Sequence, residues 1–193
     1  LAGAAEPSAS AVQRAALMEA AKGPSSIIGT PYTSAATWAA LANGTAAHAL
    51  DFDDMCWATL SHPSAPLVAA GIAAAESVGA GGRTVLEGYV VGFEVESVFG
   101  GAMNPSHYAL GWHCTSTLGT IGSAAAAARV LGLGYEATCH ALSIAASEAS
   151  GLKENFGTMV KPLHAGLAAR NGVLAALLAR EGLTASRRAI DGP

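Results

Sequence analysis

The chain has 193 residues and a net charge of −4, and only 12% of its residues are charged, about half the usual share. This low charge, together with 51% hydrophobic residues, excludes a disordered chain. Ten Lys and Arg are too few to indicate a nucleic-acid-binding protein. The length suits one domain with its own core, and a surface so poor in charge predicts that further chain or a second subunit covers part of it.

Apolar residues recur at helical spacing along nearly the whole chain, and no run alternates with period two for long enough to predict a strand. The expected helices, several of them bounded by Gly or Pro, span residues 11–22, 34–50, 64–78, 84–98, 115–131, 135–149 and 162–180. With 45 Ala and 23 Gly, these helices can approach one another closely. The predicted fold class is all-α: a multi-helix bundle of tightly packed Ala- and Gly-rich helices.

Two stretches, residues 23–50 and 97–128, contain no Asp, Glu, Lys or Arg. Either is long enough to span a bilayer, but both contain polar residues such as Asn and His, so we interpret them as buried helices and predict no membrane association. The three cysteines form no zinc or disulfide pattern, which indicates a reducing compartment, and we expect a cytoplasmic protein. The chain begins at Leu1 without Met or a signal peptide, so we expect a fragment.

Three expected helices begin beside a basic residue: His62, His113 or Lys161. Lys161 precedes a proline and is predicted at the N-cap, where its charge opposes the helix dipole unless an anion binds there too. An exposed, solvated lysine is the alternative. His113 meets a similar field, which favours the neutral imidazole that a general base needs, and Thr115 is expected to cap its helix.

The remaining histidines carry no such signal, and we interpret His48, His107 and His140 as structural. Asp51, Asp53 and Asp54 end a run of 28 residues without charge. They form a turn, a Mg²⁺ site, or a group in which one carboxylate orients a histidine or accepts a hydrogen bond from the substrate.

Common cofactor and protease motifs are absent: the sequence contains no GxGxxG, P-loop, GxSxG or HExxH. The sequence therefore predicts a pocket that uses neither a cofactor nor a metal. Its two histidines, one lysine and one aspartate suit a small di- or tricarboxylate and proton transfer beside a carboxyl group.

At these residues the sequence resembles the MmgE/PrpD family, over essentially its whole length. The matching stretches are Asn43 to Asp54, His62-Pro63-Ser64, Gly88 to Glu94, Gly111-Trp112-His113, Thr117-Leu118-Gly119, Asn155 to Met159 and Lys161 to Gly166. The family includes 2-methylcitrate dehydratases, cis-aconitate decarboxylases and iminodisuccinate epimerases. The resemblance implies a two-domain homodimer that needs no cofactor, with a large helical domain and a smaller α+β lid. Residues 1–193 would then be part of the helical domain, without the lid.

By similarity, the expected catalytic residues are His62, His113, Lys161 and Asp51, and the expected substrate-binding residues are Lys161, His164 and Thr158. We expect a cofactor-independent lyase of the decarboxylase or dehydratase type acting on a small polycarboxylate. An epimerase of an iminodisuccinate-like dicarboxylate is the first alternative. A non-catalytic helical interaction domain is the second.

Overall fold

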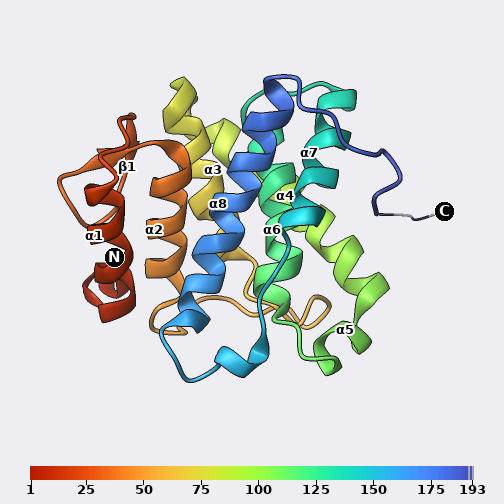
Figure 1. The fold of residues 1–193 in the computed structure, drawn as a ribbon, viewed down its shortest axis with the longest axis horizontal. Helices are drawn as coiled ribbons and strands as arrows, with labels where there is room; N and C mark the ends of the chain where they lie inside the picture. The colour runs from red at the N-terminus through yellow and green to blue at the C-terminus, as the bar shows by residue number, and fades with distance from the viewer. Residues whose placement is uncertain (191, 193) are drawn as a thin grey trace.

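The computed structural model describes residues 1–190 and 192, which form a bundle of helices (Figure 1). In chain order the elements are η1 (Ala2–Ala5), α1 (Pro7–Met18), β1 (Ser25–Ser26), β2 (Thr33–Ser34), α2 (Ala36–His48), α3 (Ser64–Val78), α4 (Gly82–Met103), α5 (Ser106–Ala109), α6 (Cys114–Val130), α7 (Tyr135–Glu148), η2 (Lys153–Asn155) and α8 (Val160–Arg180). The predicted all-α class is confirmed.

Helix α6 lies at the centre of the bundle and explains one of the two uncharged stretches. Every residue of α6 except Arg129 is buried, because α3, α4, α7 and α8 all pack around it. A helix enclosed on all sides has no polar face, so its sequence shows no amphipathic period. Within the described residues, no helix is long and apolar enough to cross a membrane.

Helices α2 and α8 touch backbone to backbone through two glycines, Gly44 and Gly166. A Cβ added at Gly166 would lie 2.2 Å from the Thr45 Oγ1 atom and 2.3 Å from the Leu41 carbonyl oxygen. A Cβ at Gly44 would lie 2.8 Å from the Gly166 Cα atom. The close approach fixes the C-terminal end of α2 relative to the N-terminal end of α8, and both of these ends carry site residues.

The other uncharged stretch begins with a hairpin that the sequence did not predict. Its two strands, β1 and β2, pair antiparallel over two residues each, too short to leave an alternating pattern. Ser25 donates a hydrogen bond from its side chain to the Ala73 carbonyl oxygen at 2.8 Å, so the hairpin is tied to α3.

Several helix boundaries also differ from those expected. Helix α1 begins at Pro7, four residues early, because proline is preorganised for the first turn. Helix α4 is longer than expected at both ends. Helix α8 begins at Val160 with Met159 at its N-cap, so the prediction that Lys161 is the N-cap is wrong: Lys161 is the second helical residue.

Candidate functional site

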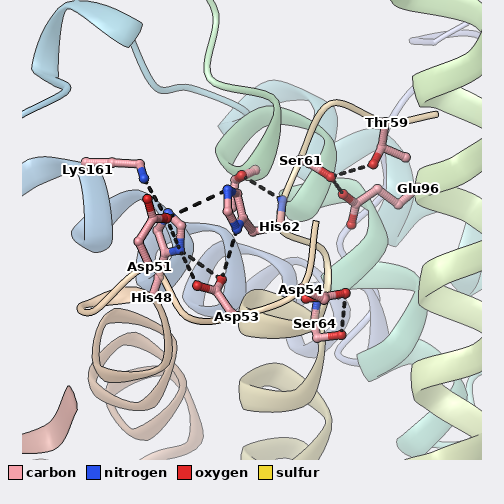
Figure 2. A network of polar contacts seen from close by, with 11 residues as sticks. His48, Asp51, Asp53, Asp54, Thr59, Ser61, His62, Ser64, Glu96 and Lys161 are labelled. Carbon is pink, nitrogen blue, oxygen red and sulfur yellow. Dashed lines mark hydrogen bonds and ion pairs between the residues drawn. The ribbon is translucent and has the colours of Figure 1, made fainter. Parts of the chain in front are cut away.

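A cavity of about 510 Å³ lies where α2 ends and where α3, α6 and α8 begin. These helix ends lie together at one end of the bundle (Figure 1), and Figure 2 shows three of the side chains that line the cavity, Asp51, His62 and Lys161. Its walls include Asp51, His62, His113 and Lys161, together with the aromatic residues Tyr108 and Phe156. All four expected catalytic residues therefore line one cavity, although they come from widely separated parts of the sequence. A second cavity, of about 380 Å³ between α4, α6 and α7, is mainly apolar and contains His107 as its one histidine.

Asp51 and Lys161 form an ion pair in the wall of this cavity. Asp51 follows the end of α2 in a left-handed backbone conformation (φ 56°), and its carboxylate accepts a hydrogen bond from the Lys161 Nζ atom at 2.7 Å. Burial acts to raise the pKa of Asp51, but the Lys161 ammonium group and, to a smaller extent, the nearby histidines together outweigh it and lower the pKa. Because Asp51 is half-exposed, a carboxylate from solution can compete with it for Lys161.

Asp53 lies deeper and contacts two histidines (Figure 2). Its carboxylate accepts a hydrogen bond from the buried His48 Nδ1 atom at 2.8 Å and lies 3.5 Å from the His62 Nδ1 atom. Burial acts to raise the pKa of Asp53, but its contacts with the two rings outweigh that effect and lower it. Asp53 is thus ionised and holds His48 with Nδ1 protonated.

His48 and Asp53 are the residues that the sequence analysis missed as parts of the site. His48 had been interpreted as structural, yet its ring centroid lies 4.7 Å from that of His62 and 6.1 Å from that of His113. Its Nε2 atom is buried without a hydrogen-bond partner among the described residues. The spacing of these two residues in the sequence could have indicated the contact, because His48 is the last residue of α2 and Asp53 follows it by 5 residues.

Asp54, the third acidic residue, caps α3. Its carboxylate accepts hydrogen bonds from the Ser64 backbone N–H at 3.1 Å and from the Ser64 hydroxyl at 2.8 Å. A negative charge at a helix N-terminus is stabilising. The three aspartates therefore have three different partners: a lysine, a pair of histidines and a helix terminus.

His62 is held in place by the helix that carries His113. The His62 backbone N–H donates to the Thr115 Oγ1 atom at 3.0 Å, so the expectation that Thr115 caps its own helix is wrong. The hydroxyl instead joins two segments that both border the cavity. The neighbouring Asp53 carboxylate raises the pKa of His62 against the opposing effect of burial, with a smaller contribution from Asp51.

A buried chain of hydroxyl groups fixes the segment just before His62 (Figure 2). The Ser61 Oγ atom lies 2.6 Å from the Glu96 Oε1 atom and 2.7 Å from the Thr59 Oγ1 atom, and Thr59 donates to the Cys56 carbonyl oxygen at 3.2 Å. Each hydroxyl carries one proton, so when Thr59 donates to Cys56 and Ser61 donates to Thr59, the carboxyl of Glu96 must donate to Ser61. Burial raises the pKa of Glu96 to about 7, which is consistent with a protonated carboxyl group.

His113 is the N-cap of α6 and is restrained on several sides. Its backbone N–H donates to the Gly151 carbonyl oxygen at 3.0 Å, and its ring meets the Phe156 ring edge-on with centroids 4.8 Å apart. Burial lowers the pKa of His113 to about 3, and the neighbouring basic groups act in the same direction. His113 is therefore neutral, as the sequence analysis expected of a base.

Thr158 and His164 are the two expected substrate-binding residues that do not line this cavity. The Thr158 Oγ1 atom donates to the Asn155 carbonyl oxygen at 2.8 Å and accepts from the Val160 backbone N–H at 3.2 Å, which stabilises the turn before α8. Thr158 borders a neighbouring cavity of about 370 Å³, on the other side of the Asp51–Lys161 pair. His164 is buried behind His113, with the two Nδ1 atoms 2.9 Å apart.

Four side chains also form a donor set of the kind that binds a divalent metal ion. One ligand atom from each of His48, Asp51, Asp53 and His62 lies within 4.8 Å of the others. Two carboxylates and two imidazoles suit several transition metals. The fit is nevertheless poor, because Asp53 already pairs with His48, and a metal ion would have to displace Lys161 from Asp51. We therefore assign no step to a metal here.

The fold and the site define a class of protein: an all-helical domain whose terminal cavity combines a protonatable histidine, a neutral histidine and a lysine. The chain belongs to the MmgE/PrpD family, since the family model for the MmgE/PrpD N-terminal domain matches residues 1–193.

Three curated relatives of this chain are cis-aconitate decarboxylases. The chain is 38% identical to the cis-aconitate decarboxylase of Homo sapiens over 160 residues, which are 80% of this chain and 33% of that protein. The identity to the Mus musculus cis-aconitate decarboxylase is also 38%, over 163 residues, 80% of this chain and 33% of the relative. The cis-aconitate decarboxylase of Aspergillus terreus is 34% identical over 160 residues, 79% of this chain and 33% of the relative. The chain thus spans about a third of the length of these relatives.

Proposed function

We propose that the full-length protein is a lyase of the decarboxylase or dehydratase type that acts on a small di- or tricarboxylate. One observation carries this proposal: a histidine with a raised pKa and a histidine with a lowered pKa lie in the same cavity as a lysine. When two environments push the pKa values of like groups apart, one group becomes the acid and the other the base. His62 is then the proton donor and His113 the proton acceptor.

Lys161 supplies the positive charge that binds a substrate carboxylate. In the free protein its ammonium pairs with Asp51 at 2.7 Å, so Asp51 occupies the position that a substrate carboxylate would take. Binding exchanges one carboxylate for another at Lys161 and leaves the half-exposed Asp51 to be solvated by water. The exchange supports a substrate with more than one carboxylate, because a single one only replaces a contact that the protein already makes.

The names of the curated relatives make cis-aconitate the first substrate to test. Loss of CO₂ from such an acid breaks a C–C bond and leaves an electron pair on carbon, which must take up one proton. His62 can deliver that proton, because Asp53 keeps the imidazolium populated. These proton transfers use groups already in the cavity, so we propose that the reaction needs no cofactor.

The same pair of histidines also supports the epimerase alternative. An epimerase removes an α-proton with a base and returns one with an acid, and His113 and His62 offer both. Decarboxylation needs only the donor. The two reactions therefore differ in how much they depend on His113.

An assay of the full-length protein in D₂O against a panel of di- and tricarboxylates distinguishes the candidates. A decarboxylase releases CO₂ and leaves one solvent deuterium in the product, whereas a dehydratase releases water. An epimerase returns substrate that carries deuterium at its stereocentre. If every compound is returned unlabelled and unconsumed, the enzyme proposal is wrong and a non-catalytic helical domain becomes the better account.

A further inference from the structure

His164 is a buried histidine beside the cavity to which the proposed function gives no role. It lies on the second turn of α8, is 3% exposed, and does not line the cavity. Its Nδ1 atom lies 2.9 Å from the His113 Nδ1 atom. Its backbone carbonyl accepts a hydrogen bond from the Ser116 hydroxyl at 3.3 Å, so α8 is also tied to the first turn of α6 at this point.

A hydrogen bond between two ring nitrogens contains one proton, so one ring donates and the other accepts. Both histidines are neutral near pH 7, since burial lowers both pKa values. A neutral imidazole carries one N–H, so the direction of this hydrogen bond fixes the tautomer of His113. If His164 donates, His113 carries its proton on Nε2; if His164 accepts, the Nε2 atom of His113 is bare.

The proposed role of His113 as a base decides between these two directions. The basic groups that line the cavity with His113 are Lys161 and His62, and each is paired with an aspartate. The Nε2 atom of His113 makes no hydrogen bond within the described residues and is not enclosed by protein atoms. Because Nδ1 faces His164, Nε2 is the ring nitrogen left to accept a substrate proton, and it can do so only when it carries no proton of its own. The proton therefore belongs on Nδ1, directed at His164.

We propose that His164 is a positioning residue: it accepts the Nδ1–H of His113 and so holds the bare Nε2 atom of His113 towards the substrate. This proposal rests on the proposed function. When the His113 Nε2 atom takes a proton from the substrate, the ring becomes an imidazolium that keeps its Nδ1–H···Nδ1 hydrogen bond to His164. That hydrogen bond becomes charge-assisted and therefore stronger in the charged state than in the neutral one.

The residues around His113 hold its ring in contact with that of His164. The edge-on Phe156 ring and the hydrogen bond from the His113 backbone to Gly151 restrain His113. Gly151 has φ +125°, and a Cβ there would lie 2.6 Å from the Ser116 Cβ atom, so no other residue fits without a shift. The loop from Gly151 to Phe156 therefore restrains His113 opposite a partner that lies on the rigid helix α8.

The test is ¹⁵N NMR of the full-length protein labelled at its histidine rings, with the His113 signals assigned by their loss in His113→Gln. Ring-nitrogen shifts distinguish the two neutral tautomers, so the wild-type spectrum tests the proposal without any substrate. We expect His113 to be the Nδ1–H tautomer. An Nε2–H tautomer in the wild type overturns the proposal.

Two variants of His164 test the consequence for catalysis. His164→Asn keeps an acceptor oxygen close to the position of Nδ1, whereas His164→Leu keeps a similar volume without an acceptor. In the Leu variant we expect His113 to shift towards Nε2–H. For a reaction that removes a proton from the substrate, as dehydration and epimerisation do, we also expect kcat to fall on the order of a hundredfold, with little change in KM. In the Asn variant we expect the wild-type tautomer and most of the activity.

An unchanged His113 tautomer in the Leu variant contradicts the proposal, and so does an equal kcat in that variant for a reaction that removes a proton from the substrate. If the wild type acts on no carboxylate, the proposed function fails, while the tautomer measurement still supports or overturns the role of His164.

Discussion

Glu96 offers a sharp test of the buried network beside His62. The side chain is fully buried, and burial raises its pKa from 4.5 to about 7. The folded protein therefore holds a proton on Glu96 that the unfolded chain releases above pH 4.5. A carboxyl group with a raised folded-state pKa stabilises the fold fully below its unfolded pKa, and this contribution is lost as the pH rises through the folded pKa. A shift from 4.5 to about 7 corresponds to a loss of roughly 3 kcal/mol between those pH values.

The substitution Glu96→Gln removes this pH dependence, because the amide is neutral at every pH and its NH₂ group can donate to Ser61. At pH 5 the variant should be about as stable as the wild type. At pH 8 it should be more stable, by on the order of 2–3 kcal/mol. The measurement is urea unfolding of the full-length protein at both pH values. The control is Glu94→Gln, since Glu94 is exposed on the same helix and should show the same difference from wild type at both. A Glu96→Gln effect of equal size at pH 5 and pH 8 refutes the reasoning.

Three further outcomes follow from the packing and the site. Gly166→Ala should destabilise the protein by about 2 kcal/mol or more, because its Cβ would meet Thr45 and the α2 backbone. The control Gly101→Ala should not, because a Cβ there meets nothing within 4 Å. Thermal melts in which Gly101→Ala is the less stable variant contradict this packing. Asp53→Asn should lower the pKa of His62, so the alkaline limb of the pH–rate profile moves to lower pH, and an unmoved limb means that His62 is not the donor. The low charge of the sequence and the exposed residues Leu86, Val90 and Val98 on α4 predict a homodimer of the full-length protein, against which a monomer by light scattering at micromolar concentration would count.

The helical class could be predicted from the sequence because the chain is rich in alanine, which favours helices, and because Gly and Pro mark several of the helix ends. The span of α3, Ser64–Val78, matches the prediction, since a proline in its first turn and Gly79 after its end mark both boundaries. The hairpin escaped prediction because two-residue strands have no period. Helix α8 begins earlier than expected because Thr158 supplies a turn that stabilises its first residues, and a proline three residues in marks the first turn without fixing its start.

The site was predictable in part. Basic residues at helix starts indicated His62, His113 and Lys161, because a helix terminus leaves a local electrostatic signature in the sequence. The contacts of Asp53 with His48 and of His113 with His164 depend on how α2, α6 and α8 pack, and no local pattern records that packing. From the sequence we expected one of the three aspartates to orient a histidine. In the structure Asp51 pairs most closely with Lys161, and Asp53 is the carboxylate nearest the His62 Nδ1 atom.

Lys161 provides the most direct test of the central claim, that this cavity is the active site of a carboxylate lyase. The measurement is CO₂ release from cis-aconitate by the full-length protein, its Lys161→Ser variant and the control Lys22→Ser, which removes an exposed lysine far from the site in sequence. Losing one charge-assisted contact to a carboxylate should lower kcat/KM by about tenfold to a hundredfold in Lys161→Ser and leave Lys22→Ser unchanged. The melting temperature should hardly move, because an ion pair whose carboxylate is half-exposed contributes little stability. A Lys161→Ser variant that keeps full activity, with or without a loss of stability, would contradict the account.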